Sequence, residues 1–100
     1  MSHLSHTRVQ TDKVALQRGA IYHGGVLLSD GVGTSTVELY DGLSTSGELL
    51  DAFRAAVSDH ESHIFERGIA IREGLYVNIG SNVSAFVLYY EPVAQGSGEE

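Results

Sequence analysis

The sequence predicts a single small domain composed mainly of β-strands, arranged as a sandwich or a barrel. Apolar residues alternate with polar ones at a period of two, turn-forming residues separate the alternating segments, and no change in composition divides the 100 residues into two parts. We therefore expect one core, enclosed by short strands.

Two segments carry the clearest strand pattern. In residues 36–40, Val37 and Leu39 fall on one face and Glu38 on the other. Residues 75–79 alternate in the same way, with aliphatic side chains at the odd positions. Each segment is predicted to be a half-buried strand.

Turn-forming residues occur at Asp30–Gly33, Asp41–Gly42, Glu73–Gly74 and Gly80–Asn82. Residues 69–77 are predicted to form a hairpin with its tight turn near residues 72–74. That register places four aliphatic side chains in the core: Ile69, Ile71, Leu75 and Val77.

Residues 48–57 are ambiguous. Thr45 and Glu48 fit a capping box, and as a strand the segment alternates poorly, so pattern alone slightly favours one short helix. The apolar residues at helical spacing are Leu49, Leu50, Phe53 and Val57.

Residues 83–90 are apolar on both faces, unlike a strand with one face in solvent. Either the strand is central and covered on both sides, or one face meets another subunit, and composition does not separate the two. The candidate subunit-interface residues are Val83, Phe86, Leu88 and Tyr90, together with Arg8 near the N-terminus.

The ends are predicted to lie outside the core. Residues 1–11 are polar and are expected to form a flexible arm, or an arm that orders on a neighbouring subunit. Residues 93–100 are expected to be a disordered acidic tail, which leaves residues 12–92 as the β domain.

Charge and composition argue against several partners. The net charge of -7 disfavours nucleic acid and anionic membranes. The chain has no cysteine, its first ten residues do not resemble a secretory signal, and its longest apolar stretch, residues 85–90, is too short to span a membrane. We expect synthesis in the cytoplasm.

Two His-x-x-His pairs, His3 with His6 and His60 with His63, are weak candidates for a metal site because neither pair has an evident set of further ligands. A solvated loop accounts better for residues 59–63. We expect no metal and no cofactor.

No catalytic constellation stands out. The chain lacks a Gly-x-Ser-x-Gly elbow, and nothing in the sequence selects two carboxylates for acid–base chemistry among Glu38, Asp41, Asp51 and Glu66. We therefore expect a protein that is not an enzyme.

The segment from Gly19 to Pro92 resembles small structural proteins of tailed bacteriophages. In that group a strand ending in Leu-Tyr-Asp-Gly, here residues 39–42, leads into a Ser/Thr/Gly loop, here residues 43–47. A later hairpin carries Gly-Leu-Tyr-Val, here residues 74–77.

The resemblance implies a jelly-roll-like antiparallel β-sandwich built into the virion, and it implies a strand, not a helix, at residues 48–57. A decoration (cement) protein on the outside of the capsid would bind the major capsid protein, commonly as a homotrimer. A neck, connector, tail or fibre component is the alternative within the same group, and the group supplies no catalytic residues.

A carbohydrate- or peptide-binding β domain is the alternative from another class. Such a domain would be a monomer with an exposed aromatic platform, formed from Tyr22, Tyr40 or Tyr76.

Overall fold

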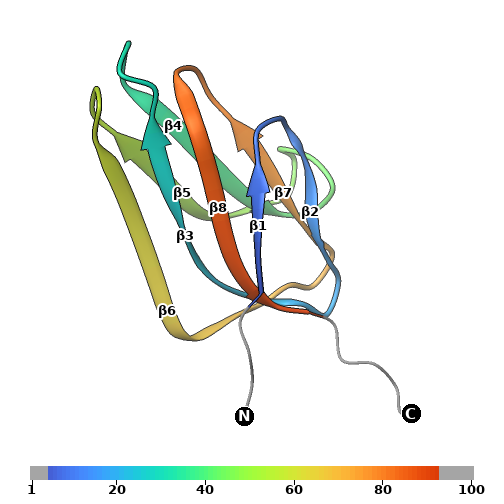
Figure 1. Cartoon of the computed structure of the whole chain (residues 1–100). Helices are drawn as coiled ribbons and strands as arrows, with labels where there is room; N and C mark the ends of the chain where they lie inside the picture. Colours follow the sequence, from blue (N-terminus) through green and yellow to red (C-terminus); the bar gives the residue numbers. More distant parts are fainter. Residues whose placement is uncertain (1–4, 93–100) are drawn as a thin grey trace.

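The computed structural model describes residues 5–92, which form eight β-strands (Figure 1). The strands are β1 (Ser5–Val9), β2 (Lys13–Gln17), β3 (Ile21–Ser29), β4 (Ser35–Asp41), β5 (Glu48–Ala55), β6 (His60–Ala70), β7 (Gly74–Ile79) and β8 (Val83–Glu91). Residues 5–92 contain no helix, and hence none able to cross a membrane.

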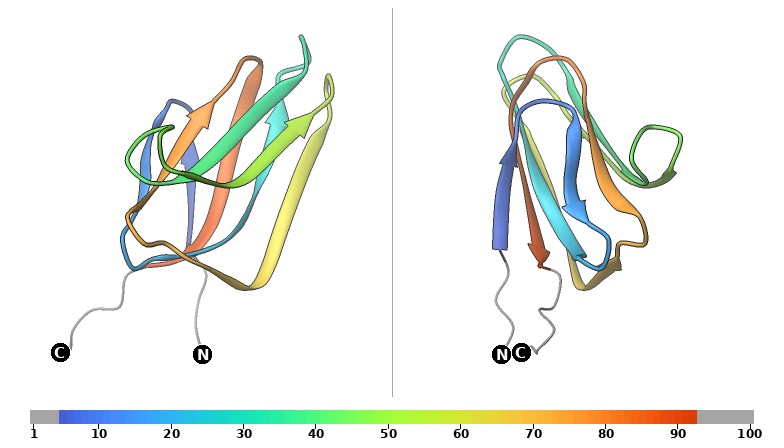
Figure 2. Two further views of the ribbon diagram at one scale, coloured as in Figure 1. Left: turned by 180° about the vertical axis from the view of Figure 1, so that it is seen from behind. Right: turned by 90° about the vertical axis from the view of Figure 1, so that its right-hand side faces the viewer.

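The strands form two four-stranded sheets that lie face to face (Figure 2). The strand orders are β1-β8-β3-β6 and β2-β7-β4-β5, and all neighbours are antiparallel. Eight strands in this arrangement form a jelly roll, so the predicted fold class is confirmed.

Most connections cross from one sheet to the other. Only β4 and β5 are consecutive strands within the same sheet. The hairpin predicted over residues 69–77 is therefore wrong, because β6 and β7 lie in different sheets. The core positions predicted with it are nevertheless confirmed. Ile71, Leu75 and Val77 are buried, and the partly buried Ile69 packs against the core. A chain that turns a corner between sheets preserves the inward direction of these side chains.

Residues 48–55 are a strand, as the resemblance implied, and the helix favoured by pattern alone is wrong. The register shifts between Leu39, which pairs with Asp51, and Tyr40, which pairs with Leu49. Leu50 is thus an extra residue in a β-bulge, and the bulge breaks the period of two. Because the bulge inserts one residue, the apolar side chains of the segment do not alternate strictly, and their spacing resembles that of a helix.

Strand β8 is a central strand, paired with β1 on one side and β3 on the other. Phe86 and Leu88 are fully buried between the sheets, so neither side chain is available to a partner. Val83 and Tyr90 are partly buried and also pack against the core, whereas Arg8 is exposed on β1. The prediction of subunit contacts on this strand stays a prediction. Val87 and Tyr89 are among its outward-facing side chains.

Part of the predicted N-terminal arm belongs to the domain. Residues 5–9 form β1, which pairs with β8 from Ser5 opposite Tyr90 to Val9 opposite Phe86. Val9 is 1% exposed. The backbone pairing and this one buried side chain hold the segment, which a search for apolar runs overlooks. Residues 1–4 and the predicted tail, 93–100, lie outside the described residues.

The core fills the space between the two sheets. Its largest fully buried side chains come from both layers, which ties the sheets together by removal of apolar surface from water. They are Tyr22, Leu27, Phe86 and Leu88 from one sheet and Leu39, Phe53, Leu75, Val37 and Val77 from the other.

Candidate functional site at the edge of the sandwich

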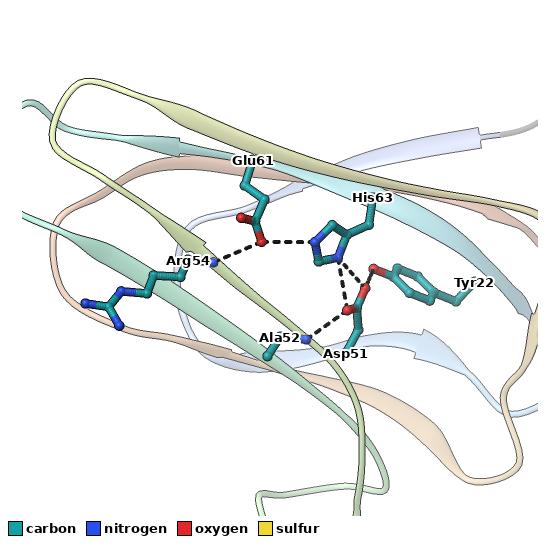
Figure 3. A network of polar contacts seen from close by, with 6 residues as sticks. All are labelled: Tyr22, Asp51, Ala52, Arg54, Glu61 and His63. Carbon is teal, nitrogen blue, oxygen red and sulfur yellow. Dashed lines mark hydrogen bonds and ion pairs between the residues drawn. The ribbon is translucent and has the colours of Figure 1, made fainter.

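A polar network lies between the two sheets at one lateral edge of the sandwich (Figure 3). Strands β5 and β6 are the outermost strands of their sheets on this side. The network consists of Asp51 from β5, Glu61 and His63 from β6, and Tyr22 from β3.

Strand geometry aims these side chains inward. Along β6, Glu61, His63 and Phe65 are half-buried while the residues between them are exposed. Asp51 pairs with Leu39, whose side chain is fully buried, so the carboxylate points into the same space between the sheets.

Asp51 is the centre of the network. The Tyr22 hydroxyl donates to Oδ2 of Asp51 at 2.9 Å, and Nδ1 of His63 lies 3.0 Å from both carboxylate oxygens. On the other side of the imidazole, Nε2 lies 2.9 Å from Oε2 of Glu61. Glu61 also accepts the backbone N–H of Arg54 at 3.3 Å. The contacts therefore join three strands and both sheets.

The geometry favours a protonated His63. Both ring nitrogens face carboxylate oxygens, which accept hydrogen bonds when ionised, and only the imidazolium can donate from both nitrogens. Burial alone would lower the pKa of His63, but the hydrogen bonds and charges of Asp51 and then Glu61 outweigh it and raise the pKa above 6.5. The ring also stacks on Phe53, with centroids 4.0 Å apart and planes 19° apart, which adds a cation–π contact.

The same carboxylate acts on Tyr22, which is fully buried. Burial, followed by the charge of Asp51 and the hydrogen bond to it, raises the pKa of the phenol far above 10, so the hydroxyl remains a donor. In the protonated ring both nitrogens of His63 carry a proton, so this form has no free lone pair with which to take a proton from a substrate. The arrangement fixes the edge of the sandwich.

A second histidine ties β6 to its own sheet. Nδ1 of His23 donates to the backbone oxygen of Phe65 at 2.8 Å, and Nε2 lies 2.7 Å from Oε2 of Glu91. In the pairing of β3 with β8, His23 is the extra residue of a bulge, and the next residue, Gly24, has φ 122°. A Cβ added to Gly24 would lie 1.8 Å from the backbone oxygen of His63. This close approach of β3 and β6 admits only glycine.

Asp41, in the Leu-Tyr-Asp-Gly motif, has a structural role. Its side chain is 3% exposed and accepts the backbone N–H groups of Arg72 and Glu73 at 3.1 and 2.9 Å. Burial would raise the pKa of Asp41, but these N–H donors, first that of Glu73, outweigh it and lower the pKa below 3.8. The carboxylate thus fastens the end of β4 to the connection between β6 and β7.

The structure separates His60 from His63, one of the two weak candidate pairs for a metal site. His60 and His63 are three apart in a strand and so face opposite sides of the sheet, with the His60 side chain 66% exposed. His3 lies outside the described residues. Between residues 5 and 92, no group of three or more metal-ligating side chains is close enough to hold an ion.

The candidate carboxylates are likewise dispersed. Glu38 lies on the outer face of the β2-β7-β4-β5 sheet, Asp41 at the end of β4 and Asp51 between the sheets. Glu66 is exposed on β6. The solvated loop predicted at residues 59–63 is mostly the beginning of β6, and His63 faces inward. The inward direction of Asp51 follows from its pairing with the buried Leu39 on the neighbouring strand, and sequence spacing does not show that pairing.

The outer face of the β1-β8-β3-β6 sheet is apolar in its middle. Val87 pairs with Val26, and Tyr89 pairs with Gly24, which pairs in turn with Ile64 on β6. Ile64 is 67% exposed. These neighbours form an apolar patch over three strands, bordered by Arg8, which pairs with Val87, and by Ser62, which pairs with Val26.

The tyrosines proposed for an aromatic platform do not all lie together. Tyr22 is in the core, whereas Tyr40 and Tyr76 pair with each other on the outer face of the β2-β7-β4-β5 sheet. The Tyr40 hydroxyl donates to Oε1 of Glu38 at 2.8 Å, and this hydrogen bond raises the pKa of Tyr40.

No protein-family model, curated protein or solved structure matches the chain. The strand order and the two-layer core define its class as a jelly-roll β-sandwich.

Proposed function

We propose that the chain is a non-enzymatic structural protein of a bacteriophage virion, a decoration protein that binds the outside of the major capsid protein shell as a homotrimer. The observation that carries this proposal is the apolar patch on the outer face of the β1-β8-β3-β6 sheet, a surface suited to contact with other proteins. The resemblance of residues 19–92 to tailed-phage structural proteins supplies the identity of the partner. Jelly rolls recur in viral capsids.

The patch has the chemistry of a protein interface. Val26, Val87, Tyr89 and Ile64 are neighbours across β3, β8 and β6, and Leu28 beside them is 42% exposed. The five residues themselves carry no charge, and the exposed Arg8, which pairs with Val87, lies at their border. Aromatic residues are enriched and charged residues depleted where interfaces are fully buried. Exposed apolar patches of this kind mark interaction sites.

Mass spectrometry of virions purified from cells that carry the encoding genome tests the proposal. We expect the chain as a stoichiometric component, located on the capsid exterior by electron cryomicroscopy, and a trimer in solution by light scattering. Its absence from the particle would refute the virion role, and density only in the neck, tail or fibre would identify the alternative component.

A pair of variants tests the surface. Val87→Glu places a charge in the middle of the patch and should abolish binding to particles that lack the protein. Thr36→Glu is the matched control, since Thr36 is exposed on the other sheet and pairs with Arg54, which favours the new charge. Equal binding by both variants would show that the patch is not the contact surface.

A further inference from the structure

The outer face of the β2-β7-β4-β5 sheet differs chemically from the apolar patch. One row of apolar and aromatic side chains crosses all four strands: the register pairs Val14 with Tyr76, Tyr76 with Tyr40, and Tyr40 with Leu49. Val14 and Leu49, at the two ends, are 43% and 53% exposed. At about 4.8 Å between strands, the row is roughly 14 Å long.

A polar pair lies beside the two tyrosines on the same face. Glu38 pairs with Asn78, one step along the strands from Tyr40 and Tyr76. The Asn78 amide donates to Oε1 of Glu38 at 3.2 Å, and the Tyr40 hydroxyl donates to the same oxygen at 2.8 Å. None of the described residues donates to Oε2, so that oxygen remains an acceptor.

The hydrogen bond to Glu38 also orients the Tyr40 ring. Residues two apart in a strand are separated by roughly 6.7 Å, so a tyrosine whose hydroxyl meets the carboxylate two residues away must lie along the strand. A ring held along the sheet loses less conformational entropy on binding than one that projects freely into solvent.

We propose that Tyr40, Tyr76, Glu38 and Asn78, the tyrosine platform, bind a neutral carbohydrate. A sugar ring has an apolar C–H face, which the tyrosine rings can contact, and a rim of hydroxyls. A hydroxyl that donates to the Glu38 carboxylate forms a charge-assisted hydrogen bond, and the Asn78 amide can both donate and accept.

Charge selects a neutral ligand over an anionic one. Glu38 lies within the platform, and the whole chain has a net charge of -7, so sulfated or uronic-acid glycans would be repelled. Glutamate is also depleted from protein–protein interfaces. The platform is therefore a poorer protein surface than the apolar patch on the opposite sheet, and the two outer faces of the sandwich are suited to different partners.

Chemical-shift mapping of the ¹⁵N-labelled full chain tests the proposal. The probes are cellohexaose, maltohexaose and chitohexaose, with a heparin hexasaccharide as the anionic comparison, and an array of neutral glycans widens the search. We expect at least one neutral glycan to perturb the backbone amides around residues 38–40 and 76–78, and the heparin fragment not to bind there.

Matched tyrosine variants make the test specific. Tyr40→Ala and Tyr76→Ala should each weaken the binding about tenfold, the effect expected from loss of one aromatic contact. Tyr89→Ala, on the outer face of the other sheet, should leave it unchanged. Asn78→Ala removes a polar contact without removing a ring and should weaken binding severalfold, and urea midpoints establish that each variant is folded.

Failure to bind any neutral glycan at millimolar concentration, preference for the heparin fragment, or equal loss in Tyr89→Ala would each overturn the proposal. The platform and the apolar patch are separate surfaces. A chain that binds glycan but is absent from virions would therefore refute only the proposed function, and a virion protein that binds no glycan would refute only the platform.

Discussion

The ion pair between Asp51 and His63 can be measured against an internal control, the exposed pair of Asp59 and His60 at the beginning of β6. Asp51 and His63 are 12% and 27% exposed and 3.0 Å apart, whereas Asp59 and His60 are 62% and 66% exposed and 3.7 Å apart. Double-mutant cycles, in which each residue of a pair is changed to alanine singly and together, give the coupling free energy of each pair.

The buried pair should couple more strongly at low pH. A hydrogen bond between charged groups contributes about 1.5–3 kcal/mol, so we expect a coupling free energy of about 2 kcal/mol for Asp51 with His63 at pH 5.5. The exposed pair should give less than about 0.5 kcal/mol. Asp51→Ala alone should cost more than the coupling, about 3–5 kcal/mol, because it also leaves the buried Tyr22 hydroxyl without its acceptor.

The coupling should depend on pH in a defined direction. The pKa of His63 is raised in the folded state above 6.5, so its contribution is fully present below pH 6.5 and is lost as the pH rises through the folded-state pKa. Above that pKa the neutral ring can donate from only one of its two nitrogens. The coupling should then fall to about 1 kcal/mol, the value of a hydrogen bond with an uncharged donor.

Urea denaturation, followed by circular dichroism and tyrosine fluorescence, gives the free energy of unfolding for each variant. A coupling below about 0.5 kcal/mol at pH 5.5, like that of the exposed pair, would refute the role of the network in fixing the edge. A coupling that stays the same while His63 titrates, with the titration followed by NMR of the imidazole, would refute the contribution of the protonated ring.

Two further substitutions probe buried polar groups of β4. Asp41→Ala leaves the N–H groups of Arg72 and Glu73 without their acceptor and should lower the free energy of unfolding by about 3 kcal/mol at pH 7. Because the folded-state pKa of Asp41 is lowered below 3.8, this difference should persist above pH 3.8 and shrink as the pH falls through the folded-state pKa. Asp41→Asn should cost less than Asp41→Ala. A difference in the free energy of unfolding that grew in acid would contradict the role of the carboxylate as acceptor. Ser35 is fully buried, and its hydroxyl has no hydrogen-bond partner among the described residues. Ser35→Ala should therefore raise the free energy of unfolding by about 1 kcal/mol. A lower urea midpoint for this variant would show that the hydroxyl does have a partner.

Much of the fold could be predicted from local pattern. Alternation located β4 and β7, and the aliphatic residues at 71, 75 and 77 were correctly placed in the core. Residues with irregular backbone were predicted less well. Leu50 occupies a bulge, which shifts the period by one residue, and pattern alone suggested a helix there. Strand β1 was missed because a short edge strand with one buried side chain has almost no apolar signal.

The candidate sites depend on contacts between distant residues. Tyr22 and Asp51 are 29 positions apart, and Asp41 and Arg72 are 31 apart. Asp51 has apolar neighbours in the sequence and Asp59 has polar ones, but neither pattern shows which carboxylate meets His63 in the fold. Their different surroundings arise only when β5 and β6 close the edge of the sandwich.

Composition and alternation are local properties that each segment carries alone, and they predict a small, acidic, predominantly β domain. The folded protein alone shows which strands share a sheet, that β6 and β7 turn a corner instead of forming a hairpin, and that Phe86 and Leu88 face the core. It also brought Tyr40 beside Tyr76. Pairing between strands far apart in the chain is decided by the packing of all eight strands together, and no single segment encodes it.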